Sequence, residues 1–458
     1  MKSYRFKYSC VLLLTALCCG SLRAQVMTLS QCRQMAVENS NAVRNANIDY
    51  CAAKEQKDEA LWAYLPSVSA GALAFHAIDP LVEISAQDIF GPSELLFDLT
   101  VAANNMGVST SYTALEKGVA GYVGLMQPVY VGGRIVNGNR LASLGVEAAK
   151  LQADIAMRDI GDEVEKDYWQ IVSLQEKKVT LQQAIALIDT LYGDVSSAHA
   201  AGLVSDNDYR LVELRRSSFQ NDMMRLDNGL LLTKMYMCNI IGKPYVVVPD
   251  SATIDTPYVG SIVFSADFDL LNSPDHYYRD ENEICGGMEE FKLLDINEKA
   301  NSLKRQMTLG EALPEVGIGA SYSYSNLFEK DRFNGMVFAS VRVPITDWGK
   351  TAHRLRRQDY QLQKARNDKE YLSEQLLLRV RQLWLEANNA WQQMQVGQQV
   401  EETAKSRMNS VGADYRAGIV SLTDYLQAQM EYRQSMDSLI DAKIAYRTAI
   451  QRYIDVQK

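Results

Sequence analysis

The chain has 458 residues, of which 47% are hydrophobic, and its 47 basic and 56 acidic side chains give a formal net charge of −9. Nucleic acid attracts basic surfaces, so this acidic balance argues against a nucleic-acid partner. The length would suit two or three ordinary domains, but the repeat described below favours one body made of two similar halves.

Residues 1–24 are typical of an export signal. A basic start (Lys2–Lys7) precedes an apolar core (Val11–Cys19), and a small-residue cleavage site ends at Ala24. The core is too short to span a bilayer as a helix, so we expect cleavage. Neither Cys18 nor Cys19 follows the small-residue pattern of a lipoprotein signal, so we expect no lipid anchor. Cleavage removes four basic residues and no acidic ones, which leaves a net charge of −13.

Four cysteines remain after the signal: Cys32, Cys51, Cys238 and Cys285. They show no CxxC spacing and no companion histidine, so the sequence predicts neither a metal site nor a cofactor. Scattered cysteines in helices are more often buried thiols than disulfides, and we expect the same here.

The first half begins with an expected helix over residues 28–65, which Pro66 ends. Alternating residues then predict a strand from Ser67 and a second from Gly118 to Tyr130. Between them, residues 77–117 form a long expected loop with a short helix around residues 94–103.

A long polar helix follows from residue 134, with apolar residues at steps of three and four. Its roughly 65 residues predict a length of about 100 Å. Gly202 is placed to end it, and Ser205 or Asp206 to begin a return helix that reaches Ile241.

The cycle then restarts after a connecting segment at residues 243–285. A helix over about 286–311 ends before Pro314, and two alternating strands follow around residues 316–324 and 337–343. A second long helix begins near residue 350 and turns at Gly418.

The two halves are copies of one unit. The separation in sequence is the same for four matching pairs, which are Pro128 and Pro344, Gly133 and Gly349, Gly202 and Gly418, and Tyr209 and Tyr425. We therefore predict a first repeat at residues 25–242 and a second at 286–458, with helical hairpins at 134–241 and 350–457.

Four strands of about ten residues, apolar on one face, fit the wall of a transmembrane barrel. Four strands cannot close a barrel, and lipid does not tolerate an open sheet edge. The pattern therefore predicts an α+β membrane protein that forms an oligomeric channel, with a subunit number that these patterns leave open.

Several motifs make the chain similar to the TolC-like outer-membrane factors, the outer membrane efflux protein family. The resemblance covers residues 26–457. It depends on Leu-Pro before strands one and three, on Gln127-Pro128 and Val343-Pro344 before the long helices, and on the paired Gly-x-Val-Ser-x-x-Asp-Tyr turns.

The resemblance implies a homotrimer in the outer membrane of a Gram-negative bacterium, with four transmembrane strands per protomer in a β-barrel and a helical α-barrel tube in the periplasm. It implies a passive exit duct for efflux or type I secretion. The implied partners are outer-membrane lipid, a periplasmic adaptor (membrane fusion) protein, and an inner-membrane transporter of the RND or ABC type.

The same resemblance assigns the helical turns to adaptor docking and residues that follow the two turns to the lumen entrance. The docking residues would be Ala201, Gly202, Leu203, Val204, Ser205, Ala417, Gly418, Ile419, Val420 and Ser421, and the entrance residues Asp208, Asp424 and Gln427. Gln427 stands where some relatives have a second acid, and Val420 where some have an arginine that pairs with the acid at the first turn.

Simpler interpretations stay open for these residues. Gly202 and Gly418 are also suited to ending helices, and Asp208 and Asp424 to completing capping boxes with the serines three positions before them.

No catalytic signature occurs, so we expect no enzyme. The alternative to a duct is a structural coiled-coil scaffold. Within the duct interpretation, drug efflux ranks before metal efflux and protein secretion.

Overall fold

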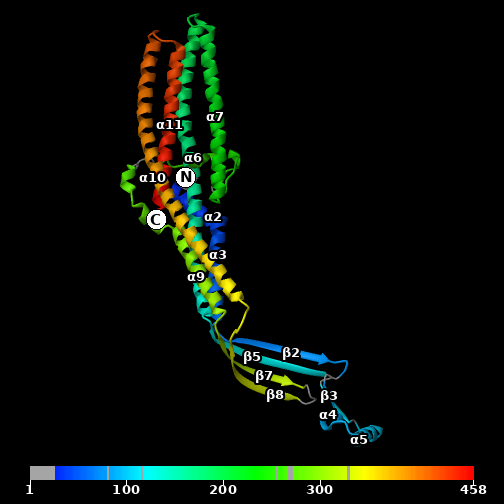
Figure 1. Cartoon of the computed structure of the whole chain (residues 1–458). Coiled ribbons are helices and arrows are strands. Elements are labelled where there is room, and N and C mark those ends of the chain that lie inside the picture. Colours follow the sequence, from blue (N-terminus) through cyan, green and yellow to red (C-terminus); the bar gives the residue numbers. More distant parts are fainter. Residues whose placement is uncertain are drawn as a thin grey trace, which may run out of the picture. The chain divides into compact units, whose positions relative to one another are not determined.

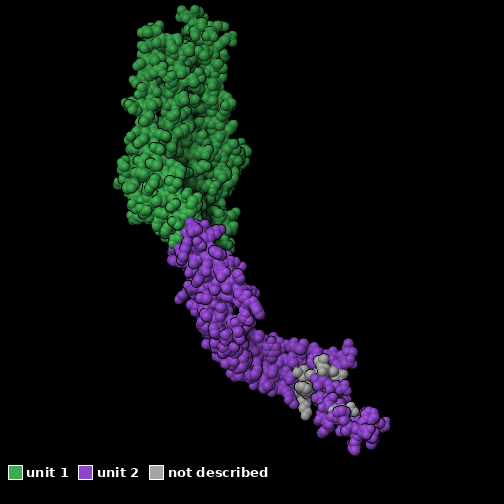
Figure 2. Space-filling model, viewed as in Figure 1, with its two compact units in different colours: residues 1–50, 149–294, 369–458 green, residues 51–148, 295–368 purple. Residues whose placement is uncertain are grey.

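The computed structural model describes residues 26–79, 82–108, 110–114, 117–253, 256–266, 272–326 and 331–457. The expected export signal lies outside these residues. The chain divides into two compact units (Figure 2), one made from the described parts of residues 1–50, 149–294 and 369–458 and the other from residues 51–148 and 295–368. Each unit takes segments from both repeats.

The elements of the first repeat are labelled in Figure 1. They are β1 (Val26–Met27), α2 (Leu29–Asn39), α3 (Asn41–Trp62), β2 (Ser67–His76), β3 (Val82–Ser85), α4 (Ala86–Phe90), α5 (Glu94–Asn105), β4 (Ser111–Ala114), β5 (Lys117–Val131), α6 (Arg134–Ala200) and α7 (Asp206–Ile240).

The described part of the connecting segment contains short elements, and longer helices and strands follow it in the second repeat. These are η1 (Pro249–Ser251), η2 (Val259–Ser261), β6 (Val263–Phe264), η3 (Pro274–Tyr277), α8 (Glu281–Gly287), α9 (Glu289–Gly310), β7 (Glu315–Ser325), β8 (Arg332–Arg342), α10 (Lys350–Arg416) and α11 (Leu422–Asp455). The two long helices α6 and α10 have 67 residues each, as the constant separation of the matching pairs requires.

The prediction of a single helix over residues 28–65 is wrong, because two helices, α2 and α3, occupy this segment. Thr28 caps α2 in a capping box with Gln31, but the helix ends at Ser40, whose backbone is extended. The Ser40 hydroxyl oxygen accepts a hydrogen bond from the Val43 amide at 3.4 Å. Serine favours helix starts because its side chain satisfies such amides, so α3 begins anew where the apolar pattern gives no sign of a break.

Residues 77–117 contain regular structure where the sequence favoured a loop. β3 and β4 pair antiparallel from Val82↔Ala114 to Ser85↔Ser111, and α4 and α5 lie between them in the chain. The Ser93 hydroxyl accepts a hydrogen bond from the Leu96 amide and caps α5, which ends two residues later than expected. We call this hairpin with its helices the insertion.

The first unit has its core where α2, α6 and α7 meet the connecting segment. Tyr168 is buried there and donates its hydroxyl hydrogen to the carbonyl oxygen of Ser265 at 2.8 Å. Its ring packs edge-on against Phe264, which belongs to the strand β6 that pairs parallel with β1. These contacts hold the connecting segment and β1 against the middle of α6.

The second unit contains a four-stranded antiparallel sheet in the order β2-β5-β7-β8. β2 pairs with β5 from Ser67↔Met126 to His76↔Lys117, and β7 pairs with β8 from Glu315↔Arg342 to Ser325↔Arg332. β5 and β7 join the two repeats. None of the described helices is long and apolar enough to cross a membrane.

A close backbone contact fixes the turn between β5 and α6 in the second unit. Gly132 has a φ of +63°, and a β-carbon built on it would lie 2.1 Å from the carbonyl oxygen of Gly310, the last residue of α9. Only glycine lets two backbones approach this closely. At the corresponding turn before α10, Trp348 has a φ of +55° and is 94% exposed.

Three of the four cysteines confirm the expectation of buried thiols. Cys32, Cys238 and Cys285 are buried and free, and burial raises the pKa of the Cys32 thiol to about 12. Cys51 is free but exposed, so the expectation is wrong for this residue.

Candidate functional site

The two expected docking turns have the same backbone geometry. The Gly202 amide donates to the carbonyl of His199, and the Leu203 amide to that of Ala198, each at 2.9 Å. These are the two bonds of a Schellman motif, and Gly202 has the left-handed φ of +73° that the motif needs.

The second turn repeats this pattern at every position. The Gly418 amide donates to the carbonyl of Tyr415 and the Ile419 amide to that of Asp414, again at 2.9 Å each, with a φ of +74° at Gly418. Among the described residues other than its chain neighbours, neither glycine has an atom within 4 Å of the position a β-carbon would take. The backbone alone therefore requires glycine, and the space beside each turn is open.

An exposed apolar side chain follows each glycine. Leu203 is 81% exposed and Ile419 is 73% exposed. The residues behind them are covered, since Leu422 is buried in a cluster with Val212 and Phe219 that joins α6, α7 and α11. Each turn thus has one exposed apolar side chain next to a glycine with open space beside it, and a buried apolar cluster supports the turns.

The capping-box interpretation is confirmed for Asp424, whereas at the first turn Ser205 caps the helix without the reciprocal bond that would complete a box with Asp208. Ser421 and Asp424 form a complete capping box, in which the Ser421 amide donates to the Asp424 carboxylate at 3.3 Å and the Asp424 amide to the Ser421 hydroxyl oxygen at 3.2 Å. At the first turn the Ser205 hydroxyl donates to the Asp208 carboxylate at 2.8 Å and accepts from the Asp208 amide at 3.1 Å.

Capping does not remove the negative charge of Asp424. The residue is exposed, and hydrogen bonds from Ser421 lower the pKa of its carboxyl group below the ordinary value of 3.8. Asp424, Gln427 and Glu431 recur at helical spacing on α11, and the Gln427 amide donates to Glu431 at 3.1 Å. Glu431 also pairs with Arg407 of α10.

Stacked aromatic rings brace both hairpins and were not foreseen from the sequence. His199 stacks on Tyr209 with ring centroids 4.9 Å apart, and Tyr415 stacks on Tyr425 at 5.3 Å. The two pairs are counterparts, since both members of the second pair occupy the positions in the repeat that the first pair occupies. The repeated tyrosine of the turn motif was the one sequence signal from which these ring pairs could have been predicted. The Tyr209 hydroxyl also shares a hydrogen bond with that of Tyr192 at 2.9 Å.

Polar contacts tie the two hairpins together within the first unit. Lys177 of α6 lies 2.7 Å from the Asp441 carboxylate of α11, and the Thr180 hydroxyl donates to Asp437 at 2.8 Å. Arg433 of α11 packs over the ring of Phe219 of α7. Because these contacts join the helical hairpins of the two repeats, both turns belong to one set of packed helices.

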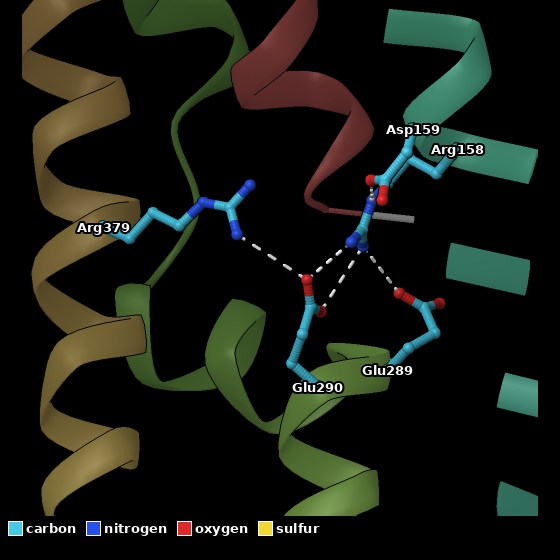
Figure 3. Close-up of polar contacts among 5 residues, drawn as sticks. All are labelled: Arg158, Asp159, Glu289, Glu290 and Arg379. Carbon is cyan, nitrogen blue, oxygen red and sulfur yellow. Dashed lines mark hydrogen bonds and ion pairs between the residues drawn. The ribbon is translucent and has the colours of Figure 1, made fainter. Parts of the chain in front are cut away.

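An ion-pair network joins α6, α9 and α10 (Figure 3). Arg158 of α6 reaches Glu289 at 2.9 Å and Glu290 at 2.5 Å, both at the start of α9. Arg379 of α10 approaches Glu290 from the other side at 3.6 Å. Arg158 therefore joins the first long helix to the beginning of the second repeat.

Comparisons with known proteins identify the fold. Several solved structures match nearly the whole chain, and three of them are described here. The outer membrane protein VceC from Vibrio cholerae has 13% identity and a TM-score of 0.70, with 93% of this chain and 95% of that chain covered. The Campylobacter jejuni CmeC outer membrane channel has 14% identity and a TM-score of 0.71, with 94% and 85% covered. The Neisseria gonorrhoeae MtrE outer membrane channel has 14% identity and a TM-score of 0.69, with 96% and 92% covered.

These similarities define the fold class as that of the outer-membrane channels, with long helical hairpins joined to an antiparallel sheet. Residues 306–452 match the family of outer membrane efflux proteins. A comparison with curated protein sequences found no match. The resemblance to outer membrane efflux proteins that the sequence predicts is confirmed by this match and by the shared fold.

Proposed function

We propose that this protein is the exit duct of a tripartite efflux or type I secretion system. Three copies form the duct in the outer membrane of a Gram-negative bacterium, with the helices in the periplasm. A periplasmic adaptor docks on the turns, and an inner-membrane transporter supplies the energy. The observation that carries this proposal is the pair of matching turns, each with an open glycine and an exposed apolar residue.

The scaffold alternative explains the helices but not the sheet. Val68, Leu73, Val337 and Val341 are all more than 60% exposed in the isolated chain. A water-exposed sheet with such residues invites aggregation, whereas lipid and neighbouring copies would cover them. The sheet therefore favours the duct.

Partner capture tests the duct directly. Intact cells are cross-linked, the protein is purified in detergent, and its partners are identified by mass spectrometry. We expect an adaptor together with an inner-membrane transporter, and the class of that transporter narrows the cargo. Recovery of self-linked copies alone would contradict the tripartite assignment.

The first prediction from the turns concerns the substitution Gly418→Asp in the second turn. The added carboxylate enters the open space beside the turn, so we expect adaptor recovery in the cross-linking experiment to drop about tenfold, which corresponds to about 1.4 kcal/mol of docking free energy. The amount of assembled protein in the membrane should be unchanged, because nothing lies within 4 Å of the new β-carbon.

Gly91→Asp is the matched control for this variant. Gly91 has a φ of +76° and equally open surroundings, so the substitution carries the same backbone strain, but it lies in the insertion. Equal losses of adaptor recovery in the two variants would mean that strain, and not docking, explains the effect.

The second prediction concerns the charge at the lumen entrance. Asp424→Asn keeps an acceptor for the Ser421 hydrogen bonds and removes one negative charge per copy. Rings of carboxylates favour cations, so the cation preference of single channels in a salt gradient should decrease. An unaltered reversal potential would exclude Asp424 from the conducting path.

A further inference from the structure

The second unit contains a cavity of about 640 Å³ between the end of α3, the start of α6 and the second half of α9. Volumes of about 300–1,000 Å³ are usual for sites that bind small molecules. All the lining residues belong to this unit, and none of them belongs to the docking turns or the lumen entrance. The proposed duct therefore gives this cavity no role.

The charged residues that line the cavity are all basic. Lys57 comes from α3, Arg140 from α6 and Lys299 from α9, and no acidic residue of the described chain lines it. Lys299 pairs with Asp295, one turn earlier in α9, at 2.6 Å. Lys57 and Arg140 have no hydrogen-bond or ion-pair partner among the described residues. Two cations of this cavity are thus not balanced by a carboxylate of the described chain.

Other arginines of the same unit are paired with carboxylates. Arg134 pairs with Glu315, and Arg354 pairs with Glu311 at 2.5 Å. Lys57 and Arg140 differ from them, because the uncharged groups beside them in the cavity are hydroxyl, amide and apolar groups. Like charges that line one cavity repel each other, and a bound anion would replace this repulsion by attraction.

Apolar side chains form the rest of the cavity wall. They are Leu61, Tyr64, Val136, Leu144 and Leu303. Leu61 and Tyr64 lie just before β2, and Val136 lies just after β5. Lys57 comes four residues before Leu61, and Arg140 four residues after Val136, so each cation is one helical turn, about 6 Å, further from the sheet. The end of the cavity next to the sheet is therefore apolar, and the cations come after it.

The cavity walls are held together by hydrogen bonds of the protein itself. The Asn139 side-chain amide of α6 donates to the carbonyl oxygen of Ala60 in α3 at 2.8 Å and to that of Ile135 at 2.9 Å. Ser143 and Ser302 add hydroxyl groups to the lining. The site is therefore formed before any ligand binds, with donors beside its cations.

We propose that this cavity binds an anionic phospholipid, with the phosphate between Lys57 and Arg140 and the acyl chains directed toward the sheet. Lysine and arginine are the usual phosphate-binding side chains, and basic pockets beside membrane spans bind anionic head groups. In the proposed duct the sheet lies in the outer membrane and the helices in the periplasm. The cavity then lies at the level of the phosphates on the periplasmic face, so this inference rests on the proposed function for the source of its lipid.

Lipid titration of the purified protein in a non-ionic detergent tests the cavity. The probes are phosphatidylglycerol, which has one net negative charge, and phosphatidylcholine, whose ammonium group balances its phosphate. Native mass spectrometry counts the bound lipids. We expect one phosphatidylglycerol for each chain and at least tenfold weaker binding of phosphatidylcholine. Equal binding of the two lipids would overturn the proposal.

The double variant Lys57→Gln with Arg140→Gln removes the two unpartnered cations. Its affinity for phosphatidylglycerol should fall about thirtyfold, since each basic residue near a lipid phosphate contributes a factor of about five. The matched control is Lys304→Gln with Arg356→Gln, which removes two exposed cations of the same unit that do not line the cavity. Equal losses in the two double variants would mean that total charge, and not this cavity, explains the binding.

Ser143→Glu provides an independent test that keeps both cations. Ser143 is exposed on the cavity wall, so the new carboxylate meets solvent and should leave the melting temperature unchanged. It would occupy the cations and repel the lipid phosphate, and phosphatidylglycerol should bind at least tenfold more weakly. Unchanged binding to this variant would contradict the proposed site.

Inorganic phosphate distinguishes a lipid from a free anion as the ligand. A lipid site gains much of its affinity from the acyl chains, so inorganic phosphate should displace phosphatidylglycerol no better than chloride of equal ionic strength. Specific displacement by inorganic phosphate would identify a free-phosphate site and overturn the lipid assignment.

The same spectra separate this proposal from the proposed function, because they also report the number of chains. A trimer that binds phosphatidylglycerol no better than phosphatidylcholine would overturn the lipid site and leave the duct in place. Binding that depends on Lys57 and Arg140, without recovery of an adaptor from cross-linked cells, would support the site and contradict the duct.

Discussion

Gly132→Ala is expected to destabilise the folded protein by about 2–4 kcal/mol, from overpacking and from a left-handed backbone without glycine. The new methyl group would lie 2.1 Å from the carbonyl oxygen of Gly310 and 2.8 Å from its carbonyl carbon. Both atoms belong to the backbone and cannot rotate away. The turn between β5 and α6 must therefore move, and with it the pairing of β5 and β7.

Gly133→Ala provides the control at the adjacent residue. Gly133 has a similar φ of +74°, but its nearest neighbour would be the Asn137 side chain at 3.9 Å. This variant bears the backbone strain without the collision, about 1 kcal/mol. Thermal unfolding in detergent, followed by circular dichroism, measures both. Equal losses of melting temperature would mean that the contact with Gly310 is unimportant.

Arg33→Met is expected to destabilise the first unit by about 3 kcal/mol at neutral pH, because it removes the cation from a largely buried pair. Arg33 pairs with Glu165, whose side chain is 4% exposed, and with Asp455 at 3.0 Å, whose side chain is 11% exposed. Glu165 keeps its bond from the Trp169 ring nitrogen at 3.3 Å, which only partly offsets its burial.

The size of this loss should depend on pH. Burial raises the pKa of Glu165 above its ordinary value of 4.5, even with Arg33 beside it. A carboxyl group with a raised pKa binds more protons when folded, so its favourable contribution is present at low pH and is lost as pH rises through the folded pKa. Without Arg33 the pKa of Glu165 rises further, so the deficit should grow as pH rises through the folded pKa of Glu165 in the two proteins.

Two controls separate this effect from general loss of charge. Arg366→Met removes a cation paired with Glu298 at 3.0 Å, but Arg366 is 63% exposed, so the loss should stay below about 1 kcal/mol. Adding Glu165→Gln to Arg33→Met removes the buried charge and should restore part of the melting temperature. A loss with Arg33→Met that does not change between pH 5 and pH 8 would contradict this account.

Much of the architecture could be predicted because each signal is local and occurs twice. Gly202 and Gly418 mark the turns, and the alternating residues mark the strands. Other features depend on contacts that no local pattern reveals. β1 and β6 have two residues each and pair across half of the chain. The break at Ser40 is a side-chain cap inside a continuous apolar pattern.

The candidate site was predictable to a similar degree. The sequence located the two helical turns and the capping serines, since glycine and serine have strong positional preferences at helix ends. It gave no indication that Gln427 donates to Glu431 or that Arg407 pairs with Glu431. Such neighbours are set by how α10 packs on α11, which depends on the whole hairpin.

The different offsets of the strands have a consequence for symmetry. β2 and β7, the first strands of the two repeats, lie further apart in sequence than β5 and β8, the second strands. The first repeat therefore has the longer strand connection, and the insertion lies within it. The helical turns carry no such difference. A ring of three copies would present six nearly equivalent turns but only three insertions. A partner with six-fold symmetry would therefore match the turns, and a partner with three-fold symmetry would match the insertions.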